Sequence, residues 1–301
     1  MAGFGILHLC QQGCKMEDDR WPKLCDAVAE DDGLPVRPAR YWTEDKLYFW
    51  NGYIHITTMA MVGKPTWPGG LVYIDLFGGP GVCKLRSGRR VPGSPLIAAH
   101  ARKPFTNIVV CEEKPELAAA CRLRLNRSGT ESQCQVLEGD CNELVQDVLR
   151  FIPDRALTLA FIDPTGLHAN FETLKTLTSG RQADLLILFA DRHDIIRNVD
   201  GYYRQGPESK LDKVLGPKSD WRRQWTQLAN QNSEKACKLF ADIYKNQLRQ
   251  LLGYEFFREE VMSSAQSPLY RLIFASKHEL GVDFWDKATK KYASGQGRLF
   301  R

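Results

Sequence analysis

Leu71-Val-Tyr-Ile-Asp75-Leu-Phe-Gly78-Gly79-Pro-Gly81 combines the two signals from which the fold is predicted. Its apolar first half lacks polar alternation, which is typical of a parallel strand buried on both faces. An acid and a glycine-rich turn follow, at the strand end where open α/β sheets bind cofactors. Glycines let the backbone approach a ligand closely, although this spacing departs from the G-x-G-x-x-G dinucleotide pattern. The predicted cofactor-binding residues of this stretch are Asp75, Phe77, Gly78, Gly79 and Gly81.

Four further apolar runs alternate with stretches of helical pattern. Together with the first run, the predicted strands are Leu71–Leu76, Asn107–Glu112, Cys134–Leu137, Leu157–Asp163 and Ala183–Phe189. The predicted helices are residues 43–61 with Thr43 as N-cap, Leu96–Arg102 with Ser94 as N-cap, Pro115–Arg127, Glu143–Phe151 and Phe171–Thr178. This alternation predicts an α/β fold in which right-handed crossovers place helices on both faces of a mostly parallel sheet.

The last third of the chain has a different pattern. Apolar residues recur at helical spacing from Ala236 to Leu251, and Gly253 is placed to end that helix. Tyr254–Met262 and Leu269–Ala275 are predicted to form an antiparallel hairpin at the edge of the sheet. Gly201–Ser219 shows no apolar period, so we expect a mobile excursion there.

A carboxylate also stands at or just after the end of each neighbouring strand. Glu112 ends the second strand, where it can accept hydrogen bonds from the ribose hydroxyls of a cofactor. Asp140, with Cys141 beside it, follows the third strand and can hold an adenine edge. Asp163 and Pro164 follow the fourth strand. Because the carboxyl ends of parallel strands meet at one edge of a sheet, these polar tips are expected to converge on one crevice.

This series of strand ends resembles the S-adenosylmethionine-dependent methyltransferase superfamily. The chain is more closely similar to the three-Cys-motif partner protein family, and the similar stretches spread over most of it. They are Trp42-Thr-Glu-Asp-Lys-Leu, Tyr73-Ile-Asp-Leu-Phe-Gly-Gly-Pro-Gly, Gly93-Ser-Pro-Leu, Phe161-Ile-Asp-Pro-Thr-Gly and Tyr270-Arg-Leu-Ile-Phe-Ala-Ser.

The resemblance implies a Rossmann-like methyltransferase fold, S-adenosylmethionine as cofactor, and association with a cysteine-rich, radical-type partner protein. We therefore expect an N-terminal extension over residues 1–40 and a helical C-terminal tail over 278–301. Between them we expect a Rossmann-like domain over 41–277, with an insertion at residues 195–232. In this assignment Asp75 and the glycine turn hold the methionine part, Glu112 the ribose, and Asp140 the adenine.

Asp163 and Pro164 are the predicted catalytic pair. Nucleic-acid amino-methyltransferases carry an acid, two prolines and an aromatic residue at this strand end, so that the acid accepts a hydrogen bond from the target amine and the ring stacks on its base. Here Thr165 and Gly166 replace the second proline and the aromatic residue. A base would then need another ring, either Phe171 or one from the aromatic-rich helix.

Two further groups of residues follow predicted strands. Lys84, Arg86, Arg89 and Arg90 lie in a predicted loop beside the crevice and are candidates for contacts to the phosphates of DNA or RNA, or simply for a solvated loop. His193 follows the fifth strand and is a candidate general base, with a surface or hydrogen-bonded histidine as the alternative.

Two rival functions remain open on the sequence. One is a non-catalytic scaffold subunit for the radical-type partner, with which the altered Thr165-Gly166 pair agrees. The other is an enzyme that uses a different nucleotide cofactor in the same crevice.

Composition sets the class of protein. The 301 residues are 43% hydrophobic and 26% charged, which excludes wholesale disorder and collagen-like repeats. A net charge of +5 permits a polyanionic partner without requiring one.

Nine cysteines, most of them in apolar runs, and an N-terminus without a signal-peptide pattern favour a cytosolic protein with no membrane segment. His8, Cys10, Cys14 and Cys25 offer soft metal ligands, but no second tight pair supports a site, so no metal is assigned.

Overall fold

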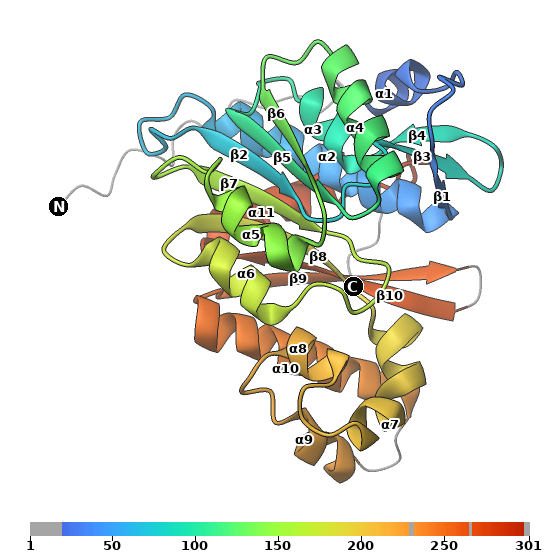
Figure 1. Ribbon diagram of the computed structural model, residues 1–301, viewed down its shortest axis with the longest axis vertical. Coiled ribbons are helices and arrows are strands. Elements are labelled where there is room, and N and C mark those ends of the chain that lie inside the picture. The colour runs from blue at the N-terminus through green and yellow to red at the C-terminus, as the bar shows by residue number, and fades with distance from the viewer. Residues whose placement is uncertain (1–19, 229–231, 265–266, 298–301) are drawn as a thin grey trace.

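The computed structural model describes residues 20–228, 232–264 and 267–297, and its centre is a seven-stranded sheet of order β6-β5-β2-β7-β8-β10-β9 (Figure 1). The strands in chain order are β2 (Leu71–Asp75), β5 (Asn107–Glu112), β6 (Gln133–Glu138), β7 (Leu157–Ile162), β8 (Gln182–Phe189), β9 (Phe256–Ser264) and β10 (Ser267–Ser276). The first five pair in parallel, and β10 is antiparallel to both β8 and β9. The predicted fold class, a Rossmann-like mostly parallel sheet with an antiparallel edge hairpin, is confirmed.

Helices cover both faces of this sheet (Figure 1). Buried apolar side chains of one face pack against α5 (Cys141–Leu149), α6 (Phe171–Thr178), α8 (Lys210–Leu215) and α10 (Ser233–Leu252). Those of the other face pack against α2 (Tyr41–Met61), α3 (Ser94–Ala99), α4 (Pro115–Arg127) and α11 (Glu279–Ala288). The aromatic residues of α2 belong to this core, since Phe49, Trp50 and Tyr53 are fully buried.

Three helix starts differ from the prediction. Helix α2 begins at Tyr41 with Arg40 as N-cap, so Thr43 lies inside its first turn. Gly93 caps α3, which begins at Ser94 and ends earlier than predicted. Helix α5 begins at Cys141, because the Asp140 carboxylate accepts the backbone N–H of Asn142 and thereby caps it.

The predicted mobile excursion at Gly201–Ser219 is wrong. This part of the chain forms α7 (Ile196–Arg204) and α8, and α9 (Trp221–Gln227) follows. Leu211, Leu215 and Trp221 are buried in the core beside α10. Their short helices are too brief to show a 3.6-residue period, which is why the sequence pattern missed them.

The segment before the predicted domain is docked onto it. Helix α1 (Trp21–Ala27) buries Trp21, and β1 (Arg37–Ala39) pairs in parallel with β3 (Val82–Leu85). Strand β4 (Arg90–Pro92) completes this small sheet, so the predicted basic loop is instead a hairpin. Figure 1 shows the small sheet beside the carboxyl ends of β2 and β5.

Asp32 fastens this N-terminal segment. Its carboxylate accepts hydrogen bonds from Arg124 at 2.7 Å and from Arg90 at 2.7 Å. Arg124 also donates to the carbonyls of Pro35 and Pro80, and so joins the segment to the glycine turn. Hydrogen bonds from Arg124 hold the pKa of Asp32 well below its usual value.

Within the described residues, no helix has both the length and the apolar character needed to cross a lipid bilayer.

Candidate functional site

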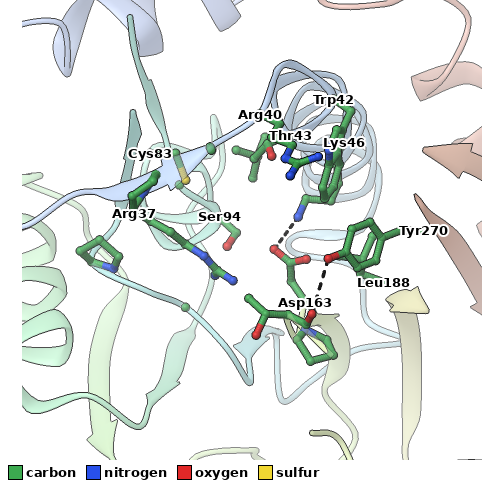
Figure 2. A pocket seen from close by; sticks show the side chains of 18 of the residues that line it. Arg37, Arg40, Trp42, Thr43, Lys46, Cys83, Ser94, Asp163, Leu188 and Tyr270 are labelled. Atoms are coloured by element: carbon green, nitrogen blue, oxygen red, sulfur yellow. Dashed lines mark hydrogen bonds and ion pairs between the residues drawn. The ribbon is translucent and has the colours of Figure 1, made fainter. Parts of the chain in front are cut away.

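A cavity of about 290 Å³ opens at the carboxyl edge of the sheet, between the glycine turn, the start of α2 and the end of β7. Figure 2 shows side chains from β1, α2, β7 and β10 directed into it. Gly78, Gly81, Asp163, Pro164 and His193 all line this space, so five of the predicted site residues come together. β2 lies between β5 and β7, where the chain connections diverge, and open α/β sheets bind ligands at such a point.

The glycine turn is tightly packed as well as open to the cavity. A Cβ atom at Gly78 would lie 2.2 Å from Cγ1 of Val110, so no larger residue fits there. Gly79 and Gly81 have φ angles of +62° and +85°, in the left-handed region that favours glycine. The turn therefore needs glycine at these three positions.

Glu112 contacts the glycine turn but does not line the cavity, so its predicted contact with a ribose stays a prediction. Its Oε2 accepts the backbone N–H of Gly79 at 2.9 Å, and its Oε1 accepts that of Lys114 at 3.0 Å. An ionised carboxylate has about four acceptor positions, so these two bonds leave room for two ribose hydroxyls. Phe77 is half-buried beside the turn.

Asp75 lies behind the turn rather than in the cavity. It is fully buried, and it accepts hydrogen bonds from the Phe77 backbone and the Tyr73 hydroxyl. Burial raises the pKa of Asp75 to about 6, although hydrogen bonds such as that from Ser94 lower it in part. Ser94 itself lines the cavity, so Asp75 acts on the site through its neighbours.

Asp163 forms a buried ion pair with Lys46, a residue that the sequence analysis did not single out. Lys46 Nζ lies 2.5 Å from Oδ2, and the two side chains are only 3% and 11% exposed. The other oxygen, Oδ1, is buried and accepts no hydrogen bond from the described residues. Figure 2 shows this carboxylate directed toward the cavity. A buried polar atom without a partner is rare, so Oδ1 is placed to accept an N–H or O–H of a ligand.

Aromatic rings form one wall of the cavity. Tyr270 lies 5.0 Å from Trp42 and 4.9 Å from His193 between ring centroids. Its hydroxyl is 3.5 Å from the carbonyl oxygen of Thr165. Trp42 comes from α2, which was one of the two predicted sources of an orienting ring. The other, Phe171, is fully buried in the core against Tyr244, and that prediction is wrong.

His193 lies in a single π-helical turn (Asp191–Ile195) after β8, a feature that often occurs at functional sites. Burial, with the positive charge of Arg197, lowers the pKa of His193. Gly166 packs closely on this turn, because a Cβ there would lie 2.9 Å from a carboxylate oxygen of Asp194.

Two arginines from the segment before α2 also line the cavity. Arg37 extends from β1 across the glycine turn toward Asp163 (Figure 2), and its Nη1 lies 3.5 Å from the carbonyl oxygen of Phe77. Burial disfavours its charge, but the acids Asp163, Glu112 and Asp75 outweigh this and raise the pKa of Arg37. Arg40 lies at the start of α2. Only the similarity of residues 42–47 to a known family pointed to this region.

Asp140 and Cys141 do not line the cavity. Asp140 caps α5, and Asn142 links it to the loop after β7 by donating to the carbonyl oxygen of His168 at 2.8 Å. Cys141 is buried in the core. Their predicted adenine contact stays a prediction, because Asp140 is exposed near the end of β6.

The four predicted phosphate-binding residues do not form one free basic patch. Arg90 is buried and paired with Asp31 and Asp32, so it cannot reach a phosphate. Arg89 is paired with Glu44 at 2.7 Å. Lys84 and Arg86 are exposed on the β3–β4 hairpin and remain candidates.

Of the four residues that could offer soft metal ligands, His8, Cys10 and Cys14 lie outside the described residues. Cys25 is buried in α1, and burial raises the pKa of its thiol to about 11. The described residues contain no group of three side chains that could hold a metal ion.

Comparisons with known proteins establish the fold and no family. No protein-family model and no curated protein matches the sequence. Among solved structures, LPL1258 from Legionella pneumophila is 11% identical with a TM-score of 0.50, over 86% of this chain and 95% of that one.

Two further structures have lower scores. The O-methyltransferase of Bacillus cereus, in complex with SAH, is 11% identical with a TM-score of 0.42, over 85% and 96% of the two chains. TomG of Streptomyces achromogenes, an O-methyltransferase in complex with SAM, is 11% identical with a TM-score of 0.40, over 87% and 100%.

Proposed function

We propose that this protein is an S-adenosylmethionine-dependent methyltransferase. One observation carries the proposal. The Glu112 carboxylate and the glycine turn, which come from two neighbouring strands, are hydrogen-bonded at the point where the chain connections diverge, beside a cavity with a buried unpaired carboxylate oxygen. This combination suits a ligand that carries both a ribose and a polar, charged end.

The residues present fit the cofactor. Glu112 has free acceptor positions for the ribose hydroxyls, and the glycine turn leaves no side chain in the way of the methionine part. Arg37 lies across that turn, so we assign its guanidinium to the methionine carboxylate, a pairing that suits its planar donor fork. When bound, S-adenosylmethionine supplies an electrophilic methyl group, and the electron pair of the broken carbon–sulfur bond stays on sulfur.

Asp163 is the proposed catalytic residue. Its Oδ1 accepts a hydrogen bond from the N–H or O–H of the methyl acceptor, orients the lone pair, and takes up the proton that the acceptor loses. Lys46 holds this carboxylate in place by pairing with Oδ2. His193, half-buried on the same wall, is a second proton acceptor within the cavity.

Nucleic acid as the acceptor, and the cysteine-rich radical-type partner, are part of the proposal on sequence resemblance alone. A second candidate function is a non-catalytic scaffold subunit. It is favoured by Thr165, which is exposed. This residue stands where a base-methylating enzyme has its second proline.

Calorimetric titration with S-adenosylmethionine tests the proposal. We expect binding that weakens by 1.5–3 kcal/mol, roughly ten- to more than a hundredfold, in Glu112→Ala, because a charged hydrogen bond to the ribose is lost. ATP and NAD serve as comparison ligands, and Glu113→Ala, an exposed neighbour, is the matched control. Unchanged affinity in Glu112→Ala would contradict the assignment. Binding without methyl transfer to DNA or RNA would favour the scaffold function.

A further inference from the structure

The charges around the cavity are unbalanced. Arg37, Arg40, Lys46 and His193 line it, together with a single acid, Asp163. Lys46 neutralises Asp163. No carboxylate among the described residues forms an ion pair with Arg37 or Arg40. The acids Asp163, Glu112 and Asp75 act on Arg37, so Arg40 is the positive charge of the lining that is left for a ligand to neutralise.

The two arginines lie at different ends of this space. Arg37 lies over the glycine turn, where the proposed function assigns it to the cofactor. Arg40 lies at the start of α2, near Thr43 and Lys46 (Figure 2). The positive charge of Arg40 lowers the pKa of His193 and opposes the rise in the pKa of Tyr270, so all three side chains share one electrostatic environment.

The backbone adds to the positive potential at Arg40. Helix α2 has 21 residues, and its first turn, with Trp42 and Thr43, borders the cavity. The unpaired N–H groups at a helix start carry partial positive charge and attract anions. On the same cavity, the buried Oδ1 of Asp163 needs a hydrogen-bond donor. A ligand that satisfies both ends carries an anionic group and an N–H or O–H.

We propose that the methyl acceptor is an anionic molecule whose phosphate or carboxylate group binds Arg40 and the start of α2, while its N–H or O–H donates to Oδ1 of Asp163. This inference rests on the proposed function and specifies the substrate class of the same site. The Trp42–Tyr270 wall lies between these two ends and suits a planar body for the acceptor. The new bond joins the acceptor atom to the methyl carbon as the carbon–sulfur bond breaks, and the proton goes to Asp163.

Binding of small aromatic amines tests this without any methyl transfer. We would titrate the protein with 4-aminophenyl phosphate, 4-aminobenzoate and the neutral 4-aminophenol. We expect both anionic probes to bind at least tenfold more tightly than 4-aminophenol, and Arg40→Gln to abolish that preference. Arg204→Gln, an exposed arginine on α7, is the matched control and keeps it.

A titration with a short single-stranded DNA oligonucleotide shows whether the anionic group belongs to a nucleic acid or to a small molecule. Binding of the oligonucleotide that also weakens in Arg40→Gln assigns the anion to a nucleic-acid phosphate, and binding of only the small probes assigns it to a small molecule. Equal binding of neutral and anionic probes, no binding of any probe, or no effect of Arg40→Gln would overturn the inference.

The same variants titrated with S-adenosylmethionine separate the two proposals. We expect Arg40→Gln to bind S-adenosylmethionine with unchanged affinity. If the unmodified protein does not bind S-adenosylmethionine, the proposed function is rejected. The preference for anionic probes is measured in a separate titration and does not depend on that result.

Discussion

Lys46 and Asp163 form a buried ion pair at the cavity, and each affects both the stability of the fold and the chemistry of the site. Both side chains are almost fully buried, and each compensates the other's charge. A buried ion pair of this kind adds little net stability, but removal of one partner leaves an uncompensated charge in the interior. The pair is therefore best explained by the site, where it holds the Asp163 carboxylate at the cavity.

A double-mutant cycle tests this pair. Asp163→Asn leaves the Lys46 ammonium buried without a counter-ion, so we expect it to lower the free energy of unfolding by about 3–5 kcal/mol. The double variant Lys46→Met, Asp163→Asn should lose markedly less than the sum of the two single variants, measured by urea denaturation. The exposed pair Lys238–Asp242 on α10 is the control, with a coupling below about 0.5 kcal/mol. Simple additivity at Lys46 and Asp163 would contradict the interpretation.

The raised pKa of the buried Asp75 carboxyl makes the free energy of unfolding depend on pH. Its pKa is about 6 in the folded protein against an ordinary value of 3.8, so the folded state binds the proton more tightly than the unfolded state. The associated stability is present below pH 4 and is lost as the pH rises to about 6. Relative to the unmodified protein, Asp75→Asn should gain on the order of 2–3 kcal/mol between pH 4 and pH 7. Denaturation at several pH values checks this, and a difference independent of pH would refute it.

At the scale of elements, the site depends on β1 being held against β3. Asp32 pairs with Arg90 and Arg124, whose side chains are only 6% and 4% exposed. Asp32→Ala should therefore destabilise the protein by about 3 kcal/mol, because Arg124 loses the carboxylate with which it pairs and Arg90 loses one of two. Amide hydrogen exchange in Arg37–Ala39 should become faster at the same time.

The neighbouring acid provides the control for this prediction. Asp31 is 77% exposed and makes one ion pair with Arg90, so Asp31→Ala should change the unfolding free energy by less than about 1 kcal/mol. Equal effects of the two substitutions would show that Asp32 has no special part in holding β1.

Continuous apolar runs and helix starts with proline were predictable from the sequence, whereas the three-residue strands and helices α7, α8 and α9 were not. Asn107–Glu112, Pro115–Arg127 and Phe171–Thr178 match the structure at both ends, because continuous apolar runs and proline at a helix start are strong local signals. β1 and β4 have three residues each and depend on pairing with β3, which no local pattern reveals.

Strand ends predicted the candidate site only in part, because Glu112 and Asp140 also follow strands and do not line the cavity. Gly78, Gly81 and Asp163 were placed correctly in one cavity because parallel strands bring their ends together. Arg37 and Arg40 come from a segment whose position depends on the Asp32 contacts, with sequence separations of up to 92 residues. Lys46 has an ordinary helical neighbourhood in sequence, and only the structure pairs it with Asp163.

For the whole molecule, the helices over residues 196–227 complete one of the two layers that cover the sheet. Trp221 is 1% exposed and packs against Phe240 of α10, with its Nε1 donating to Asp212 at 2.8 Å. We expect Trp221→Ala to lower the free energy of unfolding by about 3–5 kcal/mol, as for other buried aromatic residues. Thermal or urea unfolding checks this. A decrease in the free energy of unfolding below about 1 kcal/mol would instead support the prediction of a mobile excursion at residues 201–219.

The attachment of the N-terminal segment also has a consequence for synthesis on the ribosome. Asp32 and Pro35 can contact Arg124 only after it has been synthesised, which for Asp32 is 92 residues further along the chain, and β1 can pair with β3 only after β3 has been synthesised. Contacts between distant positions form late, because the intervening loop must close first. The cavity is lined by Arg37, Asp163 and Tyr270, so its walls come together only when segments far apart along the chain have met.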